Sequence, residues 1–289
     1  MQFIDAVEKF KLYLMQTDKS KETMSGYEKD LKNLHMFLEK TLNCTVYLEE
    51  ILTEDLEAYI LYRKECGLST STRARNLHSI KSFYRFCHKK KYIPQNIAYD
   101  LEPIKVNRKE REYLSTNEQI QLLKTIRYPI IQIIAFTLLH TGLRISECVN
   151  LKTYDVSFKH RQIKVREGKG NKDRIIPMSR DLYQELKQYA STERKCIQES
   201  DYFFATQKTG RVSTQYVNRV LKETAKELKW EKTISAHILR HTFASTLLAK
   251  GANIVEIQRL LGHSDLKTTS CYVHTTMKQL NRTVNLLNS

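Results

Sequence analysis

Apolar residues recur at helical spacing near the start of the chain. Phe3, Val7 and Phe10 stand four and three positions apart, and the same spacing continues from Tyr27 to Leu38. Because a helical turn takes 3.6 residues, this period places the apolar side chains on one face. The pattern predicts amphipathic helices in this part of the chain.

Two more helices are expected before residue 95. Thr53 stands directly before two acidic residues and is a plausible N-terminal cap. Another helix follows the hydroxyl-rich segment 69–72, with apolar residues between Leu77 and Cys87 on one side. About four helices without strand patterns indicate that residues 1–95 form a small α-helical domain.

The helical period breaks between residues 94 and 112, where prolines and a run of charges occur. We assign residues 96–112 to an interdomain linker. Helical spacing then resumes, with Ser115 or Thr116 as the cap and Glu118 in the first turn. Residues 113–289 are expected to form the second domain.

Between residues 156 and 177 the helical period gives way to strand-like alternation. Gln162–Arg166 and Asp173–Pro177 alternate and are rich in β-branched residues, with Gly168-Lys169-Gly170-Asn171 between them. This arrangement predicts a β-hairpin with lysines at its tip. The chain is therefore expected to be mainly α-helical with a small antiparallel sheet.

The charge is strongly positive and unevenly distributed. The 289 residues carry a formal net charge of +16, with a pI of about 9.5. Residues 1–60 hold an acidic excess, whereas the chain from residue 61 onward is basic. A basic surface favours a polyanionic partner, with nucleic acid as the first candidate. A merely basic protein without such a partner is the alternative that charge alone leaves open.

No feature of the sequence indicates export or a membrane span. The apolar stretch 129–139 is too short to cross a bilayer and indicates a buried helix. The six cysteines are scattered without metal-binding spacing, which is typical of reduced thiols in the cytoplasm. We expect a cytoplasmic protein without membrane contact.

Four segments of the second domain combine cationic, imidazole and phenol side chains. Guanidinium groups match the non-bridging oxygens of a phosphodiester, so the set suits phosphoryl transfer. Carboxylate clusters for Mg²⁺ are absent around these segments. Cationic side chains would therefore have to stabilise the negative charge that a metal ion stabilises in other enzymes. The segments, in chain order, are 141–147 with Arg144, 168–172 with Lys169, 237–241 with His237 and Arg240, and 261–272 with His263 and Tyr272.

Together these segments resemble the tyrosine recombinase (lambda-integrase) family. The layout is closest to its short Xer-type and transposon-encoded members, and the resemblance covers essentially the whole chain. His237 stands three residues before Arg240, and Tyr272 stands nine after His263. The resemblance implies an N-terminal helical core-binding (SAM-like) domain at 1–95. It also implies a catalytic domain at 113–289 that ends in a tail exchanged between subunits.

The resemblance also implies a role for each residue. No cofactor or metal is expected. Glu147 matches an acidic residue that orients the site, and Ala236 departs from the proline that many relatives have there. Arg144 and Arg240 would clamp the scissile phosphate, Lys169 would protonate the leaving 5′-oxygen, His237 would act as acid or base, His263 would bind a non-bridging oxygen, and Tyr272 would be the nucleophile.

Plainer roles remain open for several of these residues. Arg144 could be an ordinary ion-paired residue of a helix, and Lys172 competes with Lys169 for the acid role. Tyr272 is one of 16 tyrosines, for which a core position is the usual alternative. His237 and His241 are spaced as a helical metal pair, although no further ligands cluster with them.

Two helices carry polar and basic residues at their beginnings and are candidates for DNA contact. Such groups reach phosphates and base edges in the major groove, and a solvated helix face is the alternative. The apolar tail 280–287 would pack either on a neighbouring subunit or on its own domain. The candidate DNA contacts are Ser71, Arg73 and Arg75 in the first domain, and Thr214, Gln215, Asn218 and Arg219 in the second.

The implied reaction is site-specific recombination of double-stranded DNA at a short inverted-repeat core site. It gives a 3′-phosphotyrosine and then a Holliday junction in a homotetramer, or in a heterotetramer with a related recombinase. Integration, excision, transposition, cointegrate resolution and chromosome partition remain open as outcomes. A type IB topoisomerase, a non-catalytic DNA-binding regulator and a nuclease are the competing functions.

Overall fold

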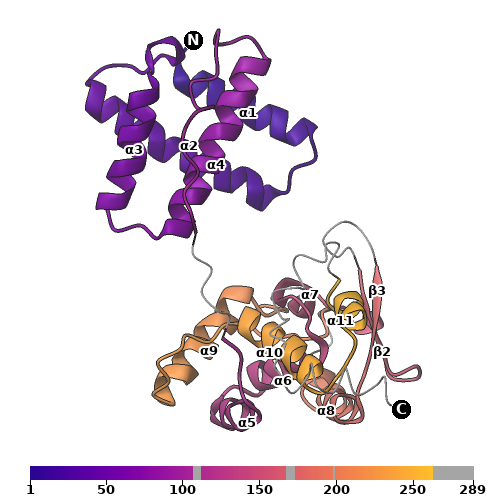
Figure 1. Ribbon diagram of the computed structural model, residues 1–289. Helices are drawn as coiled ribbons and strands as arrows, with labels where there is room; N and C mark the ends of the chain where they lie inside the picture. Colours follow the sequence, from indigo (N-terminus) through magenta and orange to yellow (C-terminus); the bar gives the residue numbers. More distant parts are fainter. Residues whose placement is uncertain (107–111, 167–172, 198, 263–289) are drawn as a thin grey trace, which may run out of the picture. The chain divides into compact units, whose positions relative to one another are not determined.

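The chain is folded into two compact units. The computed structural model describes residues 1–106, 112–166, 173–197 and 199–262 (Figure 1). The division between the units falls at Lys109 and Glu110. No helix in these ranges is both long enough and apolar enough to cross a membrane.

The first unit is a helical domain with an aromatic core. The ring centroids of Phe3 and Phe10 lie 5.1 Å and 5.6 Å from that of Phe83. These contacts pack the first helix of the unit against its last. The expected four α-helices are confirmed. They are α1 (Phe3–Gln16), α2 (Lys21–Leu42), α3 (Thr53–Glu65) and α4 (Thr70–Lys89), with a short 3₁₀ turn, η1 (Leu48–Glu50), before α3.

The expected cap of α3 is wrong. Thr53 is the first helical residue and Leu52 is the cap, whose backbone N–H donates to the Asp55 carboxylate at 2.9 Å. The Thr53 hydroxyl instead donates to the carbonyl of Ile97 at 3.1 Å. Asp55 therefore makes the N3-to-cap half of a capping box, while Leu52 has no side-chain oxygen to accept an N–H of the first turn.

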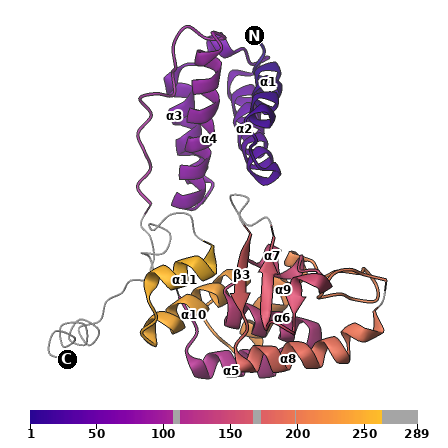
Figure 2. The same ribbon diagram turned by 90° about the vertical axis from the view of Figure 1, so that its right-hand side faces the viewer.

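The second unit is mostly helical and is built around α6. Helix α6 packs against α10 and α8 (Figures 1 and 2), and its residues 131, 133–135, 137–139 and 141 are buried. This confirms the buried helix expected at 129–139. The helices are α5 (Thr116–Thr125), α6 (Pro129–Thr141), α7 (Ile145–Val149), α8 (Arg180–Ser191), α9 (Thr214–Glu227), α10 (Ala236–Ala249) and α11 (Ile254–Leu261), with 3₁₀ turns η2 (Thr153–Asp155) and η3 (Arg194–Cys196).

The cap of α5 is as predicted. The Ser115 hydroxyl accepts the N–H of Glu118 at 3.3 Å, and the Glu118 carboxylate accepts the N–H of Ser115 at 2.8 Å. This reciprocal pair is a capping box. It fixes the point at which the chain enters the second unit.

The expected hairpin belongs to a small antiparallel sheet. Strands β1 (Val156–Ser157), β2 (Gln162–Val165) and β3 (Arg174–Pro177) lie in the order β1-β2-β3. Val165 pairs with Arg174 at the adjoining ends of β2 and β3, and the expected lysine-bearing tip falls on residues 167–172, outside the described residues. The mainly helical fold with a small antiparallel sheet is confirmed.

Gly142 allows two helices to meet closely at the end of α6. Its φ of 63° is left-handed, and an added Cβ would lie 2.4 Å from Cδ1 of Phe243 on α10. Both the backbone conformation and the contact exclude a side chain at this position. The Gly142 carbonyl is thereby brought within reach of α10.

Candidate active site

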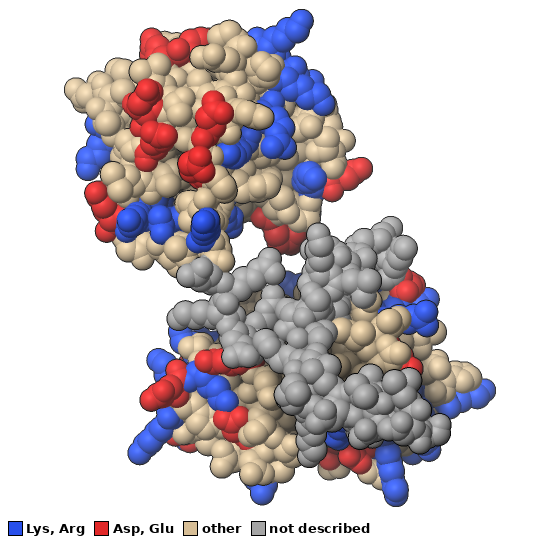
Figure 3. All heavy atoms as spheres, in the orientation of Figure 1, with Lys and Arg blue, Asp and Glu red and all other residues tan. Residues whose placement is uncertain are grey.

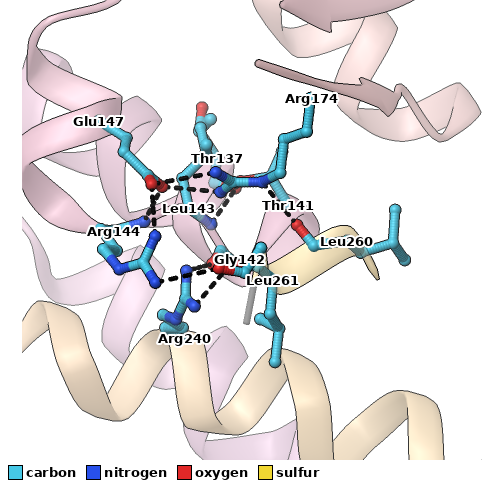
Figure 4. Close-up of polar contacts among 11 residues, drawn as sticks. Thr137, Thr141, Gly142, Leu143, Arg144, Glu147, Arg174, Arg240, Leu260 and Leu261 are labelled. Carbon is cyan, nitrogen blue, oxygen red and sulfur yellow. Dashed lines mark hydrogen bonds and ion pairs between the residues drawn. The ribbon is translucent and has the colours of Figure 1, made fainter. Parts of the chain in front are cut away.

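Three arginines converge on the C-terminal end of α11. They come from separate elements, namely the residue before α7, strand β3 and helix α10 (Figure 4). The carbonyls at a helix end lack partners within the helix and carry partial negative charge, so guanidinium groups suit them. Arg174 Nε donates to Leu260 O at 2.9 Å, Arg240 Nη2 to Leu261 O at 2.7 Å, and Arg144 Nη2 to Gly262 O at 3.3 Å.

Arg240 is almost fully buried on α10, with 2% of its surface exposed. Its Nη1 donates to the carbonyl of Gly142 at 2.6 Å, in addition to the bond to Leu261. A buried guanidinium needs such partners because desolvation of an unpaired charge is costly. These two bonds fix its position between the end of α6 and the end of α11.

Arg144 is ion-paired, as the plainer alternative expected, but it does not lie within a helix. It is the extended residue before α7, with φ −68° and ψ 147°. Its backbone N–H and its Nη1 donate to the Glu147 carboxylate at 2.8 Å and 2.7 Å. The side chain is 27% exposed. Two of its five side-chain N–H groups make the hydrogen bonds to Glu147 and Gly262 among the described residues.

Glu147 links two of the arginines. Its carboxylate is 8% exposed and accepts two bonds from Arg174, at 3.0 Å and 2.7 Å, besides those from Arg144. Burial by itself raises the pKa of Glu147. The hydrogen bonds from Arg174 and Arg144 outweigh burial and lower the pKa to about 2. Glu147 is therefore ionised at neutral pH and orients both guanidinium groups.

The low pKa of Glu147 makes stability depend on pH. The folded pKa is below the ordinary value of 4.5, so the stabilisation is complete above about pH 5 and is lost as pH falls towards 2. We expect Glu147→Gln to lower the free energy of unfolding by about 3 kcal/mol at pH 7. The difference from the unsubstituted protein should shrink below about pH 4.

The fluorescence of Trp230, the only Trp in the chain, reports denaturant unfolding of the second unit and measures this effect. Glu223 is a suitable control, because its carboxylate is 62% exposed and lies 3.9 Å from Arg219. Glu223→Gln should leave the free energy of unfolding nearly unchanged at every pH, as expected of a surface pair. A loss on Glu147→Gln that is equally large at pH 7 and pH 3 would contradict the assigned pKa.

His237 lies in the first turn of α10 and is exposed, whereas His241, one turn later, is buried. The two rings meet edge to face with centroids 4.2 Å apart. His241 thus packs beneath the exposed imidazole. In the described part of the chain, no group of three or more His, Cys, Asp or Glu side chains is placed to hold a metal ion.

Ala236, which replaces the proline of many relatives, makes a backbone hydrogen bond. The N–H of Ala236 donates to the side-chain oxygen of Asn218 at 2.9 Å, a bond that a proline could not make. The amide nitrogen of Asn218 in turn donates to Thr214 O at 3.0 Å. Asn218, a candidate DNA contact, therefore has both ends of its amide engaged within the unit, next to His237.

The other candidate DNA contacts lie at the beginnings of two helices. Ser71 is exposed in the first turn of α4, Arg73 is partly exposed, and Arg75 Nη1 is 2.5 Å from the buried carboxylate of Asp30. In the second unit, Gln215 is exposed in the first turn of α9 and Thr214 is partly exposed. Arg219 is 66% exposed, one turn further on.

Side chains of both charges share the face of the first unit that is visible in Figure 3. The acidic excess of residues 1–60 therefore does not turn this face uniformly negative. The contacts with DNA stay predictions.

Three of the predicted catalytic residues, Lys169, His263 and Tyr272, lie outside the described residues. The same holds for Lys172 and for the apolar tail 280–287. The site is thus described through Arg144, His237 and Arg240.

Arg174 was not among the site residues predicted from the sequence. It shares one face of β3 with the buried Ile176, while Ile175 between them is 58% exposed. Side chains two apart on a strand point to the same side. A charged residue at an inward position was therefore the pattern that could have identified it.

Comparison with known proteins decides the family. Residues 112–279, more than half of the chain, match the phage integrase family, and residues 7–91 match the phage integrase N-terminal SAM-like domain. The chain belongs to the phage integrase family of tyrosine recombinases. It is an enzyme of DNA strand cleavage and religation, and the characteristic reaction of the family is site-specific recombination through a 3′-phosphotyrosine.

Individual relatives match over nearly their whole lengths. The chain is 30% identical over 286 residues to tyrosine recombinase XerD of Staphylococcus saprophyticus, with 96% of each chain covered. It is 32% identical to a tyrosine recombinase of Pseudothermotoga lettingae, with 93% of each covered.

Solved structures support the same fold. The crystal structure of XerA recombinase is 26% identical, with a TM-score of 0.55 and coverage of 100% of this chain and 99% of that one. The Tn1549 transposon integrase in complex with transposon right end DNA is 21% identical, with a TM-score of 0.79 and 100% of both chains covered. The expected family, fold and enzyme class of this tyrosine recombinase are confirmed.

Proposed function

We propose that Arg144 and Arg240 bind the non-bridging oxygens of a scissile DNA phosphate while Tyr272 attacks its phosphorus. One observation carries this assignment. Arg144 and Arg240 donate to the consecutive carbonyls of Gly262 and Leu261, directly before His263 in the sequence. Two arginines almost 100 residues apart are thereby held at one place, where developing negative charge can be stabilised.

The remaining groups move the protons. The phenol oxygen of Tyr272 forms a bond to phosphorus, the bond to the 5′-oxygen breaks, and Lys169 protonates that leaving oxygen. His237 accepts or returns the phenol proton, and its exposed position in the first turn of α10 supports this role. His263 donates to a non-bridging oxygen. Because the phosphotyrosine retains the energy of the broken bond, a second 5′-hydroxyl can religate without ATP.

The biological reaction proposed is strand exchange at a short inverted-repeat core site. The helical domain and the catalytic domain would hold duplex DNA through the predicted helix beginnings at Ser71–Arg75 and Thr214–Arg219. The assembly would be a homotetramer, or a heterotetramer with a related recombinase, on DNA. A cytoplasmic location is part of the proposal and is supported by the five described cysteines, all of which are free thiols.

Sequencing the DNA that becomes covalently bound in cells tests this function and identifies the substrate. Cells that express the chain are lysed in denaturant, the protein is recovered, and the attached DNA is sequenced. We expect one short inverted-repeat sequence, attached through a 3′-phosphate. The yield should not change when EDTA is present in a cell-free cleavage reaction on that sequence.

Two results would contradict the proposal. Attachment at unrelated sequences, with relaxation of any supercoiled plasmid, would indicate a topoisomerase activity instead. Cleavage that EDTA abolishes, with no protein bound to the ends, would indicate a nuclease.

A further inference from the structure

Arg174 connects parts of the catalytic unit that carry different active-site residues. It begins β3, and only 11% of its side chain is exposed. Two of its nitrogens bind both oxygens of Glu147, and its Nε binds the carbonyl of Leu260 (Figure 4). Arg174 thus joins strand β3 to the segment of Arg144 and to the end of α11.

The geometry at Glu147 makes Arg144 depend on Arg174. Oε1 accepts from both Arg174 Nη1 and Arg144 Nη1, and Oε2 accepts from Arg174 Nη2 and from the N–H of Arg144. A bidentate pair fixes the plane of a carboxylate. Without Arg174 the carboxylate keeps only the two bonds from Arg144 itself, so the direction of the Arg144 guanidinium is less firmly fixed.

The second link reaches the end of α11. Arg174 holds Leu260 O, and the next two carbonyls are the ones that Arg240 and Arg144 bind. An added Cβ on Gly262 would lie 3.0–3.1 Å from the Arg174 guanidinium and Cδ, so Arg174 packs directly against this turn. The same side chain therefore supports both proposed phosphate-binding arginines.

We propose that Arg174 is a positioning residue for DNA cleavage, which sets the direction of the Arg144 guanidinium through Glu147 and the end of α11. Arg174 does not touch the phosphate in this scheme. The inference rests on the proposed function, since it assigns Arg174 to the charge-neutralising part of that site.

A neutral substrate separates positioning from general support of the fold. In a methylphosphonate diester a methyl group replaces one non-bridging oxygen, so the scissile centre carries no charge. Its cleavage therefore depends less on charge neutralisation by the arginines. We expect Arg174→Lys to slow cleavage of the ordinary phosphodiester by about 10- to 100-fold. Cleavage of the methylphosphonate should slow by less than about threefold, a smaller loss because the phosphorus centre has no charge to neutralise. Rates are normalised to the amount of covalent adduct formed at the end point.

Arg194 provides the matched control. It is a partly buried arginine of the same unit that donates to the carbonyls of Ile197, Ser200 and Tyr202. Arg194→Lys should lower the melting temperature but leave the ratio of the two rates unchanged. Arg144→Ala should change the ratio in the same direction as Arg174→Lys.

Equal loss on both substrates, or no loss on the phosphodiester, would overturn the positioning role of Arg174. A normal ratio for Arg144→Ala, or no cleavage by the unsubstituted protein, would overturn the proposed function itself, and the role of Arg174 with it.

Discussion

Tyr272→Phe is expected to bind the core site with unchanged affinity and to form no covalent DNA. The substitution removes only the phenol oxygen, which the proposed reaction places on phosphorus. Without the nucleophile, cleavage should fall by on the order of 10⁴-fold or more, because the remaining groups cannot replace it. Gel shift measures binding, and denaturing electrophoresis of a nicked substrate that traps the adduct measures cleavage.

A matched tyrosine controls for the loss of a hydroxyl elsewhere. Tyr154 belongs to the same unit and is 66% exposed, so Tyr154→Phe should form the adduct at the normal rate. An adduct that persists in Tyr272→Phe would show that another residue is the nucleophile. Loss of binding in that variant would instead place Tyr272 in the fold or in DNA recognition.

Arg240→Lys is expected to reduce cleavage by about 10²–10³-fold, the usual loss on removing a donor that stabilises transition-state charge. A lysine keeps the charge but cannot donate from the two directions in which Arg240 reaches Gly142 O and Leu261 O. One carbonyl is left without its partner, so unfolding should also become easier, by about 1–3 kcal/mol. Single-turnover cleavage at saturating protein measures the first effect, and Trp230 fluorescence measures the second.

A control variant separates the loss of cleavage from the loss of stability. Arg194→Lys again supplies a variant with lost carbonyl contacts, and its cleavage rate per folded molecule should stay within about threefold of normal. Arg240→Lys could instead cleave as fast per folded molecule as the unsubstituted protein. The Arg240 guanidinium would then serve only the fold, and another residue would have to bind the phosphate.

The sequence predicted the elements whose patterns are local. The period of Phe3, Val7 and Phe10 gave the first helix, the box at Ser115 and Glu118 gave the start of α5, and the alternation before Pro177 gave β3. Each of these follows from spacing within a few residues. The spacings within the four segments also sufficed to identify the family.

Contacts between distant segments could not be derived in this way. Three arginines bind the backbone carbonyls of Leu260, Leu261 and Gly262. Every residue has such a carbonyl, so the side chains at these positions do not indicate the bonds. Asn218 resembled an exposed helix residue, yet its amide accepts the N–H of Ala236. Such bonds depend on how α9, α10 and α11 pack, which local pattern does not encode.

The expected cap at Thr53 failed for a related reason. The segment offered a hydroxyl and a carboxylate at the same helix end, and propensity alone favoured the hydroxyl. Asp55 binds the N–H of Leu52, while the Thr53 hydroxyl is used by Ile97, 44 residues later. The acceptor of the Thr53 hydroxyl is distant in the sequence, and a local pattern does not indicate it.

The residue that carries the DNA can be identified chemically. Adduct formed on the core site is digested with trypsin and nuclease and analysed by mass spectrometry. Cleavage after Lys267 and Lys278 yields the peptide Thr268–Lys278, in which Tyr272 is the only tyrosine. We predict a nucleotide joined through its 3′-phosphate to Tyr272 in this peptide. A nucleotide on any other residue, or one joined through its 5′-phosphate, would contradict the account.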